Sequence, residues 1–286
     1  MATANMKDIR RRIKSVESTM QITKAMELVA SSKLRKAKLR AEAAQPFFNK
    51  LYETMCDIAQ DSVFNSIFMN KGYTNDTLLI VIAGDRGLAG GFNANVLKSA
   101  LKRAEEIQAK GKVKILPIGK KAVEFFEKRN FDILVGYQQI SEDFTVYQSS
   151  DIADKVIDCF KSSEVDNVEL FYTTFVSALI QEPKNLSIFP IDMKKPDGIK
   201  RSTTIYEPSP EAVFNGLIPK YLTGIIFGAV VDSYASEQAA RRTAMESASD
   251  NAGEMIDSLS LIYNRARQST ITQEITEIVA GSNVNN

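Results

Sequence analysis

The chain has 286 residues, of which 44% are hydrophobic and 25% charged, and its 36 Lys and Arg nearly balance 35 Asp and Glu, for a formal net charge of +1. This composition is typical of a soluble protein with one large domain or two modest ones. The absence of His and the presence of only two Cys exclude imidazole-dependent catalysis and His-ligated zinc, and they predict no zinc cluster and no disulfide framework.

Residues 1–60 carry a long helical repeat. From Ile9 to Ile58, positions in alternating steps of four and three are apolar at thirteen of fifteen places. A repeat of 3.5 residues sustained over this length predicts one strand of a left-handed coiled coil. The alternative is an amphipathic helix on a globular core, which usually ends within about 20 residues. Pro46 either bends a continuous helix or begins a second one.

Residues 209–286 form the second predicted coiled-coil helix. Ser209 is a suitable N-cap, and Pro210 suits the first helical position. The predicted apolar seam consists of Met245, Ala248, Ala252, Met255, Leu259, Ile262 and Ala266.

Between these ends, residues 75–200 change to an alternation of strands and helices. We predict strands at 77–83, 113–118, 131–135, 168–176 and 186–191, with helices at 95–110, 122–128 and 152–160. Alternating strands and helices predict an α/β domain with a largely parallel, Rossmann-like sheet. The fold class is therefore α/β plus coiled coil, in which N- and C-terminal helices pair antiparallel and the α/β domain is inserted between them.

The two helices differ in length, so one end of the longer helix is left without a partner. If Ile58 lies opposite about Ser209, Ile9 lies opposite about residue 258 and some twenty C-terminal residues remain. These residues include the apolar stripe Ile271, Ile275, Ile278 and Val279. An exposed apolar stripe predicts a socket on another protein, unless the tail folds back or frays. The longest apolar run, at 221–231, is about half the ~20 residues that cross a bilayer, so we expect no membrane span.

Three separated blocks of sequence closely resemble the gamma subunit of F-type, proton-driven ATP synthase. They are IRRRIKSVESTMQITKAMELVASSKLRKAK, GDRGLAGGFN, and SEQAARRTAMESASDNAGEMIDSLSLIYNRARQSTITQEITEIVAG. The blocks occur in the family's order and include both terminal helices, while residues 100–205 match in pattern only.

The resemblance implies a central-stalk rotor shaft that couples proton flow through the membrane sector to the catalytic cycle of the beta subunits. One copy would turn inside a ring of three alpha and three beta subunits, with the α/β domain outside near the epsilon subunit and the c-ring. It implies a non-catalytic subunit without cofactor, metal or nucleic acid. With no secretory signal or transit peptide in the first residues, we expect a bacterial, peripheral location on the cytoplasmic face of the inner membrane.

The resemblance also implies roles for particular residues. Contacts with the alpha and beta head are implied for Lys24, Met26, Arg241, Arg267, Gln268, Gln273 and Glu274. The turn loop Gly84, Asp85, Arg86 and Gly87 is implied to expose Asp85 and Arg86 for partner contact. A foot facing the c-ring and epsilon subunit is implied for Tyr206, Glu207 and Pro208. From the residues alone, a solvated helix face is the favoured interpretation of each of these charges.

The residues leave two other functions open, nucleotide binding and a role as a coiled-coil scaffold or nucleic-acid binder. GDRGLAGGFN follows a strand and precedes a helix, as nucleotide-binding loops do, but it matches neither the dinucleotide nor the P-loop spacing, and Asp85 would repel phosphate. The first forty residues hold eleven Lys and Arg against three Asp and Glu, which suits a coiled-coil scaffold or a nucleic-acid binder whose affinity falls steeply with salt.

Overall fold

The computed structural model describes residues 2–61, 66–69, 74–139, 143–191 and 205–284. The chain divides into two compact units, one formed by Met1–Ala30 with Arg242–Asn286 and the other by Ser31–Arg241. We call them the coil unit and the α/β unit. Two long helices, α1 (Ala2–Asp61) and α5 (Pro210–Val284), contribute to both units. The division into segments 1–60, 75–200 and 209–286 stays a prediction, and residues 192–200 of the middle segment lie outside the described ranges.

The apolar repeat of the first sixty residues is confirmed. All fifteen predicted positions from Ile9 to Ile58 are buried or half-buried, while most positions between them are exposed. Pro46 lies inside α1, which continues without interruption for 60 residues. The packed seam therefore keeps the helix intact although Pro46 supplies no backbone N–H for an intrahelical bond.

The apolar seam of α5 is shifted from its predicted positions. Met255 is 58% exposed and Ile262 is 48% exposed. The half-buried neighbours Ile256 and Tyr263 take their places, and Thr270 extends the seam. Counting from Met245, alternating steps of four and three residues give the observed buried and half-buried positions. The prediction alternated the same steps but began with three. Both phases offer apolar residues at these turns, so hydrophobicity alone did not select between them.

The two helices pair antiparallel in the coil unit, with a register different from the predicted one. The hydroxyl oxygens of Thr23 and Ser249 are 2.7 Å apart and share a hydrogen bond. The predicted alignment of Ile58 with Ser209 would have placed Thr23 opposite about Ala244. The helix ends explain the difference, because α1 runs on to Asp61 and α5 begins only at Pro210.

A disulfide cross-link can test this register. In Thr23→Cys/Ser249→Cys, two sulfurs replace oxygens that are 2.7 Å apart, so we expect a disulfide of about 2.0 Å to form under mild oxidation. The two native cysteines are buried and neither forms a disulfide, which leaves the introduced pair to react. Mass spectrometry of the non-reduced chain measures the cross-link. Thr23→Cys/Ala244→Cys is the control, and a cross-link in the control rather than in the first pair would contradict the register.

The α/β unit contains one five-stranded sheet, ordered β3-β2-β1-β4-β5. Its strands are β1 (Thr77–Ile82), β2 (Val113–Ile118), β3 (Asp132–Ile133), β4 (Asn167–Phe175) and β5 (Gln181–Phe189). The first four are parallel where they pair, and β5 runs antiparallel to β4. The predicted parallel sheet is confirmed, with an antiparallel edge because five residues between β4 and β5 allow only a hairpin.

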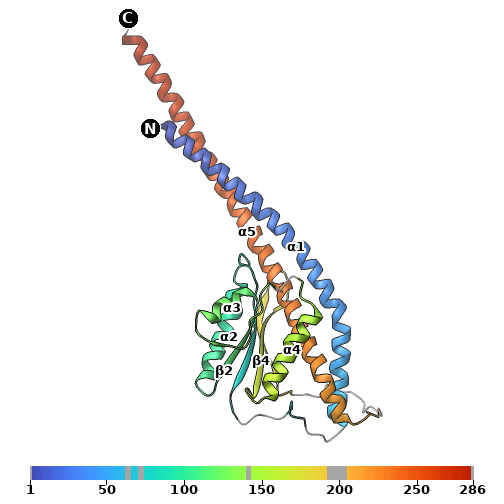
Figure 1. Cartoon of the computed structure of the whole chain (residues 1–286). Helices are drawn as coiled ribbons and strands as arrows, with labels where there is room; N and C mark the ends of the chain where they lie inside the picture. The colour runs from blue at the N-terminus through green and yellow to red at the C-terminus, as the bar shows by residue number, and fades with distance from the viewer. Residues whose placement is uncertain (1, 62–65, 70–73, 140–142, 192–204, 285–286) are drawn as a thin grey trace. The chain divides into compact units, whose positions relative to one another are not determined.

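Each face of the sheet has its own hydrophobic core. Alternate side chains of β1 point to opposite faces, so Leu78, Ile80 and Ile82 join one core while Leu79 and Val81 join the other. The helices that cover these faces are α2 (Phe92–Gln108), α3 (Lys120–Glu127) and α4 (Val146–Lys161), together with α5. Figure 1 shows α2 and α3 on one face of the sheet and α4 with the early part of α5 on the other.

Local signals fix where the helices begin. Ser209 caps α5 as predicted, because its hydroxyl accepts a hydrogen bond from the Ala212 N–H at 3.1 Å. Helix α4 begins six residues before the predicted Ile152, where Thr145 and Gln148 form a capping box. This box explains the earlier start, since it satisfies the first backbone N–H groups of the helix.

Helix α5 includes an 18-residue stretch with a mean hydropathy of 1.4, which by length and composition alone could cross a membrane, and 44% of that stretch is buried inside the chain. In the same helix Phe214, Ile218, Leu222 and Ile226 are 0% exposed and belong to the core on the α4 face. We therefore assign the apolar character of α5 in this region to packing within the α/β unit.

Candidate functional site

The glycine loop after β1 is held by hydrogen bonds from its own chain. The Asn93 side chain accepts from the Gly84 N–H at 2.8 Å and donates to the Arg86 carbonyl at 3.1 Å, so it bridges both ends of the turn. The Asp85 carboxylate accepts from the backbone N–H groups of Lys120 and Gln139, at 2.8 and 2.9 Å. Asp85 thus joins the loop to the segments that follow β2 and β3.

Two side chains of α5 close on the same loop. The Arg241 guanidinium donates to the Gly87 carbonyl at 3.1 Å and to the Glu237 carboxylate at 2.5 Å. A Cβ atom on Gly84 would lie 2.8 Å from Glu237 Cδ, so the carboxylate occupies the space that only glycine leaves open. We call Glu237, Arg241 and the loop residues 84–87 the loop clamp.

The ion pair of the loop clamp is buried. Glu237 is 4% exposed and Arg241 is 8% exposed. Burial raises the pKa of the Glu237 carboxyl, Arg241 lowers it in part, and the nearby Asp85 and Arg86 act in opposite directions. Because a buried charge is costly without its partner, each member of the pair depends on the other.

The loop clamp occupies the place where related α/β folds bind nucleotides. Rossmann-type sheets bind ligands beyond the carboxyl ends of strands where the strand order reverses, and here β1 lies between β2 and β4. The Glu237 carboxylate packs on Gly84 at this point. A carboxylate against the glycine backbone repels phosphate, so the geometry disfavours the nucleotide-binding alternative.

The predicted contact residues of the loop and of α5 differ in exposure. Arg86 is exposed and Asp85 is half-buried. Arg241 was predicted as a cation that meets the head, but its guanidinium is engaged inside the α/β unit. A direct contact between Arg241 and another subunit therefore stays a prediction, and it would require the side chain to leave the loop clamp.

In the coil unit, the predicted head contacts lie outside the seam. Lys24 is exposed and Met26 is half-buried on α1. On α5 the exposed predicted contacts are Arg267, Gln268, Gln273 and Glu274. Gln273 donates a hydrogen bond to Glu277 one turn later, at 2.9 Å. Contact between these side chains and the alpha and beta subunits stays a prediction.

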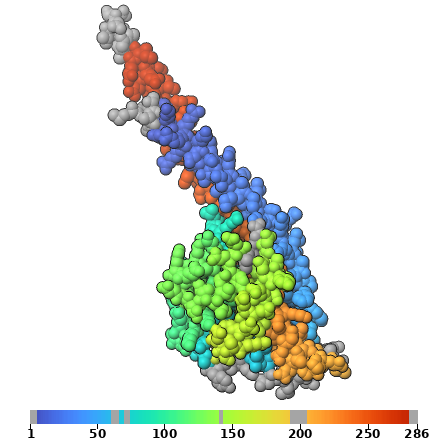
Figure 2. Space-filling model, viewed as in Figure 1, coloured from blue at the N-terminus to red at the C-terminus, as the bar shows by residue number. Residues whose placement is uncertain are grey.

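The end of α5 carries an apolar stripe with no covering helix among the described residues. Ile271, Ile275, Ile278 and Val279 are between 48% and 72% exposed. The buried seam of α5 ends at Thr270, which is 7% exposed. Figure 2 shows the C-terminal part of α5, in red, extending past the N-terminal part of α1, in blue. An exposed end of α5 is therefore present, but it begins after Thr270 and not after about residue 258 as predicted.

The predicted foot lies immediately before α5. Tyr206 is half-buried and packs against the core on the α4 face, while Glu207 and Pro208 are exposed. The preceding Ile205 is 87% exposed. Residues 192–204, which lead into the foot, lie outside the described ranges. The role of this segment toward a c-ring or an epsilon subunit stays a prediction.

Sequence reasoning missed three residues of the loop clamp region. They are Asn93 and Glu237, described above, and Gly119, whose φ of +97° and close approach to the Ala83 carbonyl leave no room for a side chain. The spacing of Glu237 and Arg241, four residues apart on a helix, was a readable signal for an ion pair. Asn93 is the last residue of the GDRGLAGGFN motif, but its spacing did not indicate that its side chain bridges the turn, and no sequence signal marked Gly119 as a neighbour of the loop.

The fold and the site together define a protein with two long terminal helices and a Rossmann-like α/β unit. The sequence pattern of the family described as ATP synthase matches residues 5–284. The ATP synthase gamma chain of Ruminococcus albus is 60% identical over 280 residues, which cover 98% of both chains. The gamma chain of Alkaliphilus metalliredigens is 45% identical over 285 residues, which cover 97% of both chains. The chain therefore belongs to the gamma-chain family of ATP synthase, which confirms the resemblance and the central-stalk rotor function expected from it.

Solved structures share the fold. A chain of the mitochondrial ATP synthase of Euglena gracilis aligns with a TM-score of 0.71 at 17% identity, covering 99% of this chain and 95% of that chain. A chain of the central stalk and c-ring structure from Tetrahymena thermophila aligns with a TM-score of 0.60 at 24% identity, covering 80% of this chain and 99% of that chain. At these identities the likeness confirms the fold class, including the terminal helices with an α/β domain between them.

Proposed function

We propose that one copy of this chain turns inside a ring of three alpha and three beta subunits and performs no bond chemistry itself. The α/β unit would lie outside the ring, where the foot residues Tyr206, Glu207 and Pro208 meet the c-ring and the epsilon subunit. The complex would sit on the cytoplasmic face of the bacterial inner membrane, with this chain as a peripheral subunit. Proton flow through the membrane sector would drive its rotation.

The exposed end of α5 is the observation that carries this proposal. An isolated helix end with a continuous apolar stripe is unfavourable in water and is stabilised by a surrounding protein surface. A smooth apolar stripe in a socket also suits rotation, because it lacks the directional ion pairs that would hold the helix at one angle. The exposed polar residues Arg267, Gln268, Gln273 and Glu274, with Lys24 and Met26 on α1, would provide the few places where rotation pauses.

The mechanism follows from differential stabilisation. A shaft that presents a different surface to each of three equivalent subunits favours a different conformation in each of them, and this coupling changes their affinity for nucleotide. Rotation then moves every beta subunit through binding, ATP formation and release. Arg241 would contribute through the loop that it holds, because it bonds the Gly87 carbonyl next to the exposed Arg86, and Arg86 would then meet the partner.

Charged substitutions in the apolar stripe at the end of α5 test whether this end lies in a socket of the ring. We expect Ile275→Asp/Ile278→Asp to lower ATP-driven proton pumping of the assembled complex at least about tenfold, because two carboxylates would have to be desolvated inside the socket. Proton pumping and ATP hydrolysis are measured together in inverted membrane vesicles. Thr276→Asp, an exposed site on the same turn, is the control and should retain pumping. Pumping at the wild-type level in the double variant would contradict the socket.

The salt dependence of partner binding separates this function from nucleic-acid binding. We expect the chain to remain bound to its alpha and beta partners at moderate salt, because the contact would bury apolar surface. Affinity for nucleic acid would instead fall steeply as salt rises.

A further inference from the structure

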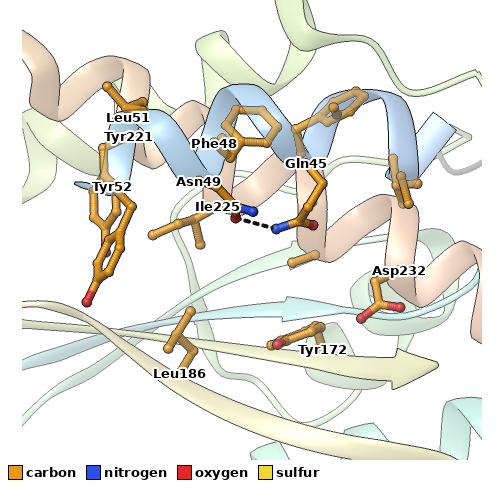
Figure 3. Close-up of a pocket in the computed structure, with 17 residues that line it drawn as sticks. Gln45, Phe48, Asn49, Leu51, Tyr52, Tyr172, Leu186, Tyr221, Ile225 and Asp232 are labelled. Carbon is orange, nitrogen blue, oxygen red and sulfur yellow. Dashed lines mark hydrogen bonds between the residues drawn. The ribbon is translucent and has the colours of Figure 1, made fainter. Parts of the chain in front are cut away.

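A cavity of about 460 Å³ lies in the α/β unit between α1, α5 and the β4–β5 edge of the sheet. This volume is within the usual range of small-molecule sites. Figure 3 shows Phe48 above the cavity and Leu186 below it, with Tyr52 and Tyr221 at one end and Tyr172 and Asp232 at the other. The cavity therefore has an aromatic end and an acidic end.

Glycines of α5 create the cavity. A Cβ atom on Gly224 would lie 2.2 Å from Phe48, so the phenyl ring packs directly on the helix backbone and forms a wall. A Cβ atom on Gly228, which also lines the cavity, would meet no atom within 4 Å. The open space thus faces Gly228, and a larger side chain there would enter it.

The lining of the cavity is mainly apolar and aromatic. The rings of Tyr52 and Tyr221 stack with centroids 6.3 Å apart, and Phe48 and Phe227 also lie 6.3 Å apart. Burial raises the pKa of Tyr221 to about 12, so its phenol stays neutral at physiological pH. Faces of such rings attract organic cations as well as apolar groups.

Asp232 is the only charged side chain among the seventeen residues that line the cavity, all of which are described by the structure. Its carboxylate accepts a hydrogen bond from the Phe175 N–H at 3.0 Å. Burial raises the pKa of this carboxyl, while hydrogen bonds from Phe175 and Thr174 and the charge of Lys184 lower it in part. A half-buried carboxylate held by the backbone at one end of an apolar slot is a fixed acceptor for a cationic group.

We propose that this cavity binds a small organic cation, a primary ammonium group carried on an aromatic or apolar body. The ammonium group would donate to Asp232 and the body would lie between Phe48, Tyr221 and Leu186. Charge complementarity selects this occupant, because neither a neutral nor an anionic body of the same shape can compensate the carboxylate. Its binding would connect α1 and α5 to the edge of the sheet.

Tryptamine is a suitable probe, since the chain contains no Trp and the indole fluorescence of the probe can be excited where tyrosine absorbs little. We expect the full chain to raise tryptamine fluorescence anisotropy saturably, with a Kd below about 1 mM. The neutral analogue tryptophol and the anion indole-3-acetate should each bind at least about tenfold more weakly, a difference of about 1.4 kcal/mol.

Two variants test separately the charge of Asp232 and the open volume beside Gly228. Asp232→Asn retains an oxygen acceptor for the Phe175 N–H and should weaken tryptamine about tenfold while leaving tryptophol unchanged. Gly228→Leu should abolish binding of both compounds. Gly216→Leu is the matched control on α5, because a Cβ there also meets no atom within 4 Å and the residue does not line the cavity. Equal binding of tryptamine and tryptophol, or full binding by Gly228→Leu, would overturn the proposal.

Discussion

Replacing Arg241 with alanine is expected to destabilise the folded chain by about 3–5 kcal/mol, because it leaves the Glu237 carboxylate buried without its partner. The guanidinium bond to the Gly87 carbonyl, 3.1 Å in the structure, is lost as well. Urea unfolding followed by circular dichroism measures the free energy of unfolding. Arg241→Lys keeps the positive charge but cannot reach both Glu237 and the Gly87 carbonyl as the guanidinium does, so we expect a smaller loss in the free energy of unfolding.

The Arg241→Ala variant should also acquire a characteristic pH dependence. Burial already raises the pKa of Glu237, and loss of Arg241 removes a group that lowers it. A carboxyl with a raised pKa keeps its proton in the folded state while the unfolded state ionises, so stability falls as pH rises above the ordinary value near 4.5. The slope is at most about 1.4 kcal/mol per pH unit. Glu237→Gln/Arg241→Ala should lose this extra slope, and a pH-independent difference between Arg241→Ala and wild type would contradict the buried pair.

Among the glycines that the structure describes, Gly119→Ala should cause the largest loss of folding stability, about 4 kcal/mol or more. The added Cβ would lie 1.9 Å from the Ala83 carbonyl oxygen, and the φ of +97° is already unfavourable for an L side chain. Relief of this clash requires backbone movement, which would pull the segment before Gly84 away from the loop clamp. Thermal and urea unfolding of the full chain measure the loss.

Gly87→Ala is the matched control for this prediction. A Cβ atom on Gly87 meets no atom within 4 Å, and Gly87 is not among the positive-φ glycines. We therefore expect a change of less than about 0.5 kcal/mol. If Gly119→Ala were tolerated as well as Gly87→Ala, the close packing of residue 119 on the end of β1 would be wrong.

The seam of α1 could be predicted in full from the sequence, whereas the seam of α5 could not. Along α1, exposed apolar residues are too few to define a second continuous stripe, so only one phase of the repeat is possible. Along α5, Met255 and Ile256 are both apolar, as are Ile262 and Tyr263. The partner helix selects one of each pair, and that selection depends on the register fixed by contacts such as Thr23 with Ser249.

The candidate site also has one part that could be predicted from the sequence and one part that could not. Exposure of the end of α5 followed from the unequal lengths of two helices, which the sequence displays. The loop clamp could not be predicted from the sequence, because it joins residues about 150 positions apart through a close backbone approach. The resemblance implied a contact between Arg241 and another subunit, and the residues alone favoured a solvated helix charge. Only the packing of α5 against the sheet revealed that its partners lie within the chain.

The pairing of the two chain ends has a consequence for biosynthesis. Thr23 and Ser249 are separated by 226 residues, so at about 5–20 residues per second a ribosome takes about 10–45 seconds to deliver the second helix after the first. During that interval the apolar stripe of α1 emerges without its partner. Contacts of such high sequence separation form late in folding. We therefore expect the apolar stripe of α1 to stay without its partner helix until translation of α5 is complete.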